Sequence, residues 1–189
     1  MAEHTRIQTP SEEVSNEADS RQLELAKGQG AAAANALRYL AHEVADSGED
    51  QRAGEYVVTY ALENAEGLYH LRNGELEWVE PDRENLHVEV AVRDGADGRI
   101  VPGLRVLVTL IDSQGREIGT HEHPLLWHPC VNHYGRNWYV PGDGEYTIRV
   151  RIEPPQFPRH DKINGCRFKT PVEVTFRSVH AKTGRKKSD

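Results

Sequence analysis

The chain has 189 residues and a formal net charge of −7, with its acidic residues spread along the sequence rather than gathered in blocks. This charge argues against a nucleic-acid-binding protein, because such proteins carry basic surfaces that contact phosphates. The length suits one domain with a hydrophobic core and short flanking segments. No apolar run approaches the roughly 20 residues that a membrane-spanning helix needs.

The two ends of the chain are polar. Residues 1–20 are charged and poor in apolar side chains, and we expect them to be disordered. They contain no basic n-region and no apolar h-region, so the sequence shows no secretory signal and favours a cytoplasmic protein, unless a leader was removed before residue 1. The basic residues within 179–189 are interpreted as a solvated tail. The two cysteines, Cys130 and Cys166, could pair, bind a metal or stay free.

A helix is predicted over residues 31–46, within an N-terminal helical segment 21–50. Its apolar side chains recur at i, i+3, i+4 and i+7, the spacing of one helix face. Those positions are Leu37, Leu40, Ala41 and Val44. We expect Gly28 and Gly30 to interrupt any earlier extension, and Gly48 to end the helix.

From about residue 55 the hydrophobic pattern changes to strict alternation, which is typical of β-strands. Asn73-Gly74 is a strong signal for a two-residue hairpin turn. The predicted strands are 56–60, 69–72, 75–79, 86–92, 104–111, 146–153 and 172–176. Short strands at this spacing predict a mainly β fold, an immunoglobulin-like antiparallel β-sandwich over residues 55–178 with an N-terminal helix. Segment 120–140 is expected to be a long irregular loop, and its Trp, His and Pro content favours a functional role.

One predicted strand carries a metal-binding pattern. His87 and Glu89 are two residues apart on strand 86–92, so both side chains project from the face opposite the apolar one. A histidine and a carboxylate at this spacing can bind one cation together. The alternative is a solvated sheet face that carries a histidine by chance.

More histidines lie further along the chain. His121 and His123 are also two residues apart, His128 follows a tryptophan, His133 lies in Asn-His-Tyr-Gly, and His160 lies in Arg-His-Asp. Each one alone is more typical of a structural or exposed residue. Because they lie on either side of one hairpin strand, together they favour a convergent site, and neutral imidazole suits copper, iron, nickel and zinc.

Competing catalytic patterns are weaker. The sequence has no Gly-x-Ser-x-Gly, no phosphate-binding loop and no His-Glu-x-x-His. Cys130 lies near His133 as a nucleophile–base pair would, but nothing supplies a third member or an oxyanion hole. A metal-binding protein is therefore favoured over a cysteine hydrolase.

Three motifs in order carry a family resemblance. They are Leu-His-Val-Glu-Val at 86–90, His-Tyr-Gly-Arg-Asn at 133–137 before the turn and strand Pro-Gly-Asp-Gly-Glu-Tyr-Thr-Ile, and Pro-Pro-x-x-x-Arg-His-Asp-Lys at 154–162. Over roughly residues 55–177 the chain resembles the periplasmic iron- and copper-binding proteins known as iron transporter proteins, which include a treponemal lipoprotein antigen.

This resemblance implies a metal site made by His87, Glu89, His133 and His160. It implies a copper or iron ion, with zinc as a further candidate, and a homodimer that works beside a membrane iron permease in the periplasm or at the cell surface. The family is not known for hydrolysis, so the implied role is non-enzymatic metal handling. Binding needs deprotonated rings, and we expect affinity to fall below about pH 6.

The family also places a methionine ahead of its His-Tyr-Gly motif, whereas the only methionine here is Met1. His128, His123 or Cys130 could take its place. Imidazole in place of a thioether makes the site harder and favours Cu(II), Fe or Zn over Cu(I). Two other functions stay open at this point: an interaction module that binds no metal, and a metal-dependent redox or hydrolytic enzyme.

Overall fold

The computed structural model describes residues 15–187 as a β-sandwich with one long helix. The helical part consists of α1 (Ser20–Tyr39) and a π-helical turn (Leu40–Val44). The strands are β1 (Ser47–Ala53), β2 (Tyr56–Glu63), β3 (Leu68–Arg72), β4 (Glu75–Val79), β5 (Leu86–Asp94), β6 (Val106–Asp112), β7 (Glu117–His123), β8 (Leu125–Leu126), β9 (His133–Trp138), β10 (Gly144–Ile152) and β11 (Val172–Ala181).

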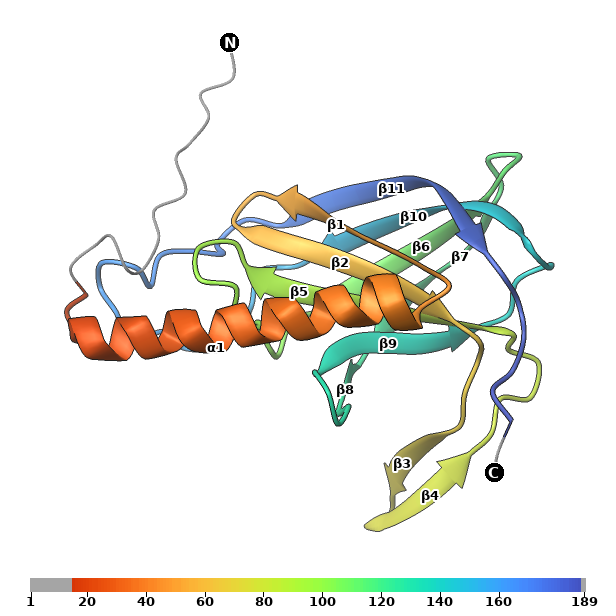
Figure 1. Cartoon of the computed structure of the whole chain (residues 1–189), viewed down its shortest axis with the longest axis horizontal. Coiled ribbons are helices and arrows are strands. Elements are labelled where there is room, and N and C mark those ends of the chain that lie inside the picture. The colour runs from red at the N-terminus through yellow and green to blue at the C-terminus, as the bar shows by residue number, and fades with distance from the viewer. Residues whose placement is uncertain (1–14, 188–189) are drawn as a thin grey trace.

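Two antiparallel sheets pack face to face, as Figure 1 shows. One has five strands in the order β1-β2-β5-β9-β8, and the other has four in the order β11-β10-β6-β7. Alternate side chains of each strand fill the space between the sheets, for example Val88 and Val90 of β5 and Ile148 and Val150 of β10, all fully buried. The predicted mainly β sandwich with an N-terminal helix is confirmed.

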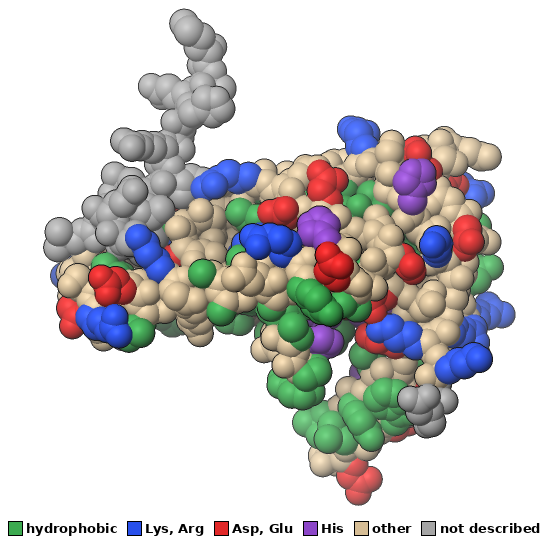
Figure 2. Space-filling model, viewed as in Figure 1, with side chains coloured by type: hydrophobic (Ala, Val, Ile, Leu, Met, Phe, Trp, Pro, Cys, Tyr) green, Lys and Arg blue, Asp and Glu red, His purple; other side chains and the backbone are tan. Residues whose placement is uncertain are grey.

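The β3–β4 hairpin forms a separate two-stranded sheet that projects from the sandwich (Figure 1). Asn73 and Gly74 make its turn with positive φ angles of 52° and 87°, as the Asn-Gly signal predicts. Figure 2 shows hydrophobic side chains along this projection. The exposed ones on the hairpin are Tyr69, Leu71, Leu76 and Trp78.

The helix begins earlier than the predicted range 31–46, and Gly28 and Gly30 lie inside it. Its start is fixed by a capping box, in which the Asp19 side chain accepts from the Gln22 amide and the Gln22 side chain accepts from the Asp19 amide. Two hydrogen bonds thus satisfy N-terminal donors that the helix itself leaves unpaired. The prediction that residues 1–20 are disordered is wrong for the described residues 15–20, and residues 1–14 lie outside the described part.

Gly30 permits close packing rather than a helix break. A Cβ atom there would lie 1.8 Å from the Asp97 carbonyl oxygen. Only glycine therefore lets α1 lie against the loop that contains Asp97 and follows β5. Nearer its end, the helix packs Leu37 and Leu40 against Ala91 of β5 and Val131. The helix therefore covers part of the outer face of the five-stranded sheet. The covered part includes Ala91, which lies two residues after Glu89 on β5.

Three further expectations differ from the structure. The predicted helical segment 21–50 ends in the polar edge strand β1, which pairs with β2 and shows no apolar alternation. Segment 120–140 is not one irregular loop, because it contains most of β7 together with β8 and β9. The basic segment 179–189 begins inside β11, which runs to Ala181.

Within residues 15–187, no helix is both long and apolar enough to cross a membrane.

Core packing gives a direct test of this fold. Phe176 on β11 is fully buried, and its ring lies 4.7 Å from that of Tyr60 on β2 in the opposite sheet. Phe176→Ala removes this contact and leaves a cavity, so we expect the free energy of unfolding in urea to fall by about 3–5 kcal/mol. Trp127 is 79% exposed, and the matched control Trp127→Ala is expected to change it by less than about 0.5 kcal/mol. Equal effects of the two substitutions would contradict the sandwich core.

Candidate metal centre

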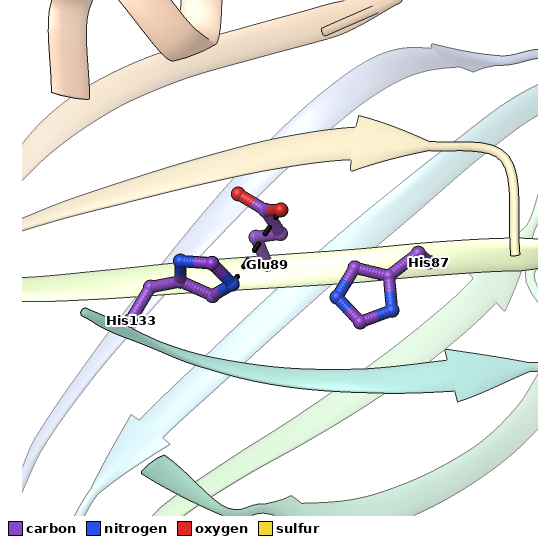
Figure 3. Close-up of side chains that lie close together, drawn as sticks. All are labelled: His87, Glu89 and His133. Atoms are coloured by element: carbon purple, nitrogen blue, oxygen red, sulfur yellow. Dashed lines mark ion pairs between the residues drawn. The ribbon is translucent and has the colours of Figure 1, made fainter. Parts of the chain in front are cut away.

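Three side chains converge on the outer face of the five-stranded sheet. His87 and Glu89 come from β5 and His133 from the start of the neighbouring strand β9, and all three are buried (Figure 3). One ligand atom from each lies within 4.8 Å of the others. The register pairs Glu89 with Gly135, so His133 lies diagonally across from Glu89 on the same face. Two nitrogens and one oxygen thus come together.

Asn137 fixes the orientation and tautomer of His87. Its amide nitrogen donates to the Glu66 carbonyl at 2.7 Å and its Oδ1 accepts from the Glu66 amide at 3.3 Å, so the two ends of the amide cannot be exchanged. The same Oδ1 lies 2.8 Å from His87 Nδ1. Nδ1 must therefore carry the proton, and Nε2 of the neutral ring presents a lone pair.

His133 is held in the same way by the main chain. Its Nδ1 donates to the Val131 carbonyl at 3.2 Å, which leaves Nε2 as the free nitrogen, 3.5 Å from Glu89 Oε1. His87 Nε2 is buried and has no hydrogen-bond partner among residues 15–187. A buried polar atom without a partner is costly, and a bound cation would satisfy it.

Gly135 leaves room beside these ligand atoms. A Cβ atom at this position would lie 3.0 Å from His87 Nε2 and 2.7 Å from a methyl group of Leu126. Its φ angle is not positive, so the glycine is needed for space rather than for an unusual backbone conformation. The free nitrogens, the carboxylate and this space fit a transition-metal ion.

The charges of the site favour metal binding near neutral pH. Burial lowers the pKa of His87, and it lowers the pKa of His133 to about 4, so both rings are neutral at pH 7. Burial, and then the nearby carboxylates Glu63 and Glu66, raise the pKa of Glu89 to about 8. In the metal-free protein Glu89 therefore holds a proton at pH 7, and a metal ion would replace it.

The other predicted ligands do not join this group. His128 is half-buried, with its ring 5.5 Å from that of His133, but its Nδ1 accepts from the Cys130 amide, so Nε2 carries the proton. His160 is exposed in the loop between β10 and β11. That loop contacts the chain just before α1, where the Lys162 amide donates to the Asn16 side chain at 2.7 Å, as can be followed in Figure 1.

The remaining histidines of segment 120–140, His121 and His123, both lie next to the ring of Trp138. His123 is buried and its Nε2 accepts from the Trp138 indole at 3.0 Å, while the exposed His121 ring lies 4.6 Å from the Trp138 ring. Burial lowers the pKa of His123 to about 3, so it is a neutral hydrogen-bonding residue. Cys130 and Cys166 are both exposed and free, so no disulfide joins them here.

Sequence reasoning missed several residues of this site. Gly135 and Asn137 follow His133 at i+2 and i+4 on a strand, so strand periodicity places all three on one face. That signal was present in the His-Tyr-Gly-Arg-Asn motif. Glu63 and Glu66 come from another part of the chain and carry no comparable signal.

The comparisons with known proteins identify the family. The model of the Fe2+ transport protein family matches residues 78–181, more than half of the chain, and this range contains all three converging residues. No curated protein matches the sequence.

Solved structures share the fold at low sequence identity. FetP of uropathogenic E. coli strain F11, expressed in the periplasm of E. coli, is 20% identical, with a TM-score of 0.59, over 71% of this chain and 93% of FetP. A copper-bound FetP variant gives 20% and 0.58 over 71% and 95%. Copper-reconstituted P19 of Campylobacter jejuni gives 16% and 0.61 over 73% and 96%. With its sandwich fold and its family match, this chain belongs to the Fe2+ transport protein family.

Proposed function

We propose that this chain binds one transition-metal ion through His87, Glu89 and His133, as a non-enzymatic component of iron uptake or metal handling. The observation that carries the proposal is the pair of Nε2 lone pairs, fixed by Asn137 and the Val131 carbonyl beside a buried carboxylate. Partners of this kind orient ligand histidines in metal sites. By analogy with its family, we place the protein in the periplasm or at the cell surface beside a membrane iron permease.

The donor set narrows the choice of metal. Two imidazoles and one carboxylate are borderline to hard ligands, and they contain no sulfur, so they favour Cu(II), iron or zinc over Cu(I). The copper-bound structures of FetP and P19 support copper, and the family supports iron. We propose copper or iron as the physiological ion, with zinc as the third candidate.

Additional ligands come from outside the group of three. His128 lies beside His133 and would have to move its proton from Nε2 before it could bind. His160 is exposed and apart from the group within one chain. We propose that His160 contributes only in a homodimer, by reaching the metal centre of a second copy.

Metal stoichiometry tests the proposal. After removal of metal with a chelator and separate loading with Cu(II), Fe(II) or Zn(II), elemental analysis is expected to find one ion per chain for the preferred metal. His87→Ala and His133→Ala are expected to lose it, because each removes a nitrogen ligand. Asn137→Ala is expected to weaken binding by about 10–100-fold, since it frees the His87 ring.

The exposed His180 on β11 supplies the matched control, and His180→Ala is expected to keep full binding. Binding that survives both His87→Ala and His133→Ala would rule out this centre. Absence of stoichiometric metal in the unsubstituted chain would instead support an interaction module. Sedimentation tests whether the chain forms the proposed homodimer. A His160→Ala variant that binds the metal ion as tightly as the unsubstituted dimer would exclude His160 as a ligand.

The pH dependence of binding is expected to follow Glu89 rather than the histidines. The pKa of Glu89 is about 8 and that of His133 about 4, so the proton that competes with metal at neutral pH is on the carboxyl group. The expected loss of affinity therefore begins near pH 8 rather than pH 6. Titrations should show a decrease of about tenfold per pH unit below pH 8, because binding releases one proton.

Glu89→Gln cannot take up that proton, so its affinity is expected to be weaker but nearly constant between pH 6.5 and 8. An unchanged pH slope in this variant would contradict the assignment of the released proton to Glu89.

A further inference from the structure

The C-terminal end of helix α1 lies beside the proposed metal centre. Leu37, near the end of α1, and Leu40, the first residue of the π-helical turn, are buried in one apolar cluster with Ala91 and Val131. This cluster is separate from the core between the two sheets. The helix also lies outside residues 78–181, the range that the family model matches, so its role is inferred from its own contacts.

Val131 connects this cluster to a candidate ligand. Its side chain is 8% exposed and packs in the cluster, while its main-chain carbonyl accepts the hydrogen bond from His133 Nδ1 at 3.2 Å. One residue thus has its side chain under the helix and its carbonyl oxygen on the ligand ring. The position of that carbonyl, and with it the direction of the free Nε2 of His133, therefore depends on where α1 holds Val131.

The segment that contains Val131 needs support from outside. Residues 127–132 join β8 to β9 and belong to neither strand. The side-chain hydrogen bonds here are local, because the His128 amide donates to Asn132 Oδ1 at 3.1 Å and the Cys130 amide donates to His128 Nδ1 at 3.1 Å. Such bonds shape the turn but do not fix it against the sheet. The packing of Val131 under α1 supplies a contact with a distant part of the chain.

The helix that provides this contact is itself closely packed on both sides of Leu37. Before it, Gly30 lets α1 lie against the Asp97 carbonyl. After it, a Cβ atom at Gly48 of β1 would lie 2.6 Å from the Ala41 carbonyl oxygen, so β1 packs directly against the π-helical turn. Two close approaches between main-chain segments therefore fix the end of the helix in place.

We propose that α1 supports the metal centre, with Leu37 and Leu40 as positioning residues that hold the Val131 carbonyl on His133 Nδ1. Without this support the ring would turn and its two neutral tautomers would interconvert. Nε2 would then present its lone pair for part of the time, and the apparent metal affinity would fall by that fraction. This role rests on the proposed function, because it acts at the same centre.

Titration of the full-length chain with Cu(II) tests this role. Leu37→Ala leaves space beside Val131 and is expected to bind Cu(II) about tenfold more weakly than Leu25→Ala, since partners that orient a ligand histidine have effects of this size. Leu25 lies on the same helix and is 58% exposed, which makes it the matched control. Leu37→Met refills the space and is expected to restore the affinity to within about twofold.

A double-variant comparison shows whether the effect passes through Val131. Val131→Ala is expected to weaken Cu(II) binding as Leu37→Ala does, and the double variant is expected to bind no more weakly than either single one, because both substitutions remove the same contact. Fully additive losses would contradict a shared contact.

Nuclear magnetic resonance of the metal-free protein gives a readout that needs no ion. Long-range ¹H–¹⁵N spectra distinguish the two neutral histidine tautomers, and both His87 and His133 are expected to carry the proton on Nδ1 in the unsubstituted chain. In Leu37→Ala the His133 nitrogens are expected to shift toward a mixture of tautomers. His87 is held by Asn137 instead and is expected to keep its shifts. Unchanged His133 shifts, or equal changes at both rings, would overturn the support by α1.

The outcomes separate this role from the proposed function. Cu(II) binding that His133→Ala leaves unchanged would refute the metal centre itself. Loss of Cu(II) in His133→Ala, together with equal affinities of Leu37→Ala and Leu25→Ala, would leave the metal centre in place and overturn the role of the helix.

Discussion

The antiparallel register of β5 and β9 is the constraint on which the candidate metal centre depends. Val88 and Val90 fill the core between the sheets, so His87 and Glu89 must face the other way. Pairing Glu89 with Gly135 then brings His133 and Asn137 onto that same outer face. A slip of one residue would exchange the two faces of the strand, so core packing also specifies the ligand geometry.

Burial gives this outer-face site its chemical character. The Asn137 side chain hydrogen-bonds both the His87 ring and the backbone of Glu66. It therefore fixes the tautomer of a candidate ligand and also holds in place the segment around Glu66, which follows β2. Near the C-terminus, the main chain of Gly184 and Lys186 bonds in turn to Ala65, the residue before Glu66. Enclosed this way, the histidines are kept neutral and Glu89 is kept protonated in the absence of metal. Burial therefore leaves the histidine nitrogens unprotonated and able to bind a metal ion, and it makes metal binding depend on release of the Glu89 proton.

The sequence predicted those features that depend on local periodicity. Alternation identified β5 and placed His87 and Glu89 on one face, and Asn-Gly located the β3–β4 turn. Features that depend on contacts between distant segments were not predictable in this way. Gly30 resembled a helix breaker because its partner, the Asp97 carbonyl, lies far along the chain. Lys186 resembled a tail residue for the same reason, because its partners Glu63 and Glu66 lie far away in the sequence. His160 was expected at the metal centre because its motif is part of the same family resemblance, but its loop lies elsewhere in the molecule.

For the metal ion proposed above, three candidate ligands from one chain suit transfer of the ion better than a structural role. Structural metal sites are usually closed by four protein ligands, and small domains that need such an ion unfold without it. Here the two sheets enclose a continuous hydrophobic core of their own, and one chain brings three ligands together. The proposed ion would therefore not be required to hold the sandwich together, and coordination positions would remain on it for water or a group from a partner. An ion held by three groups, one of which takes up a proton when the ion leaves, can be released without unfolding the protein that carries it.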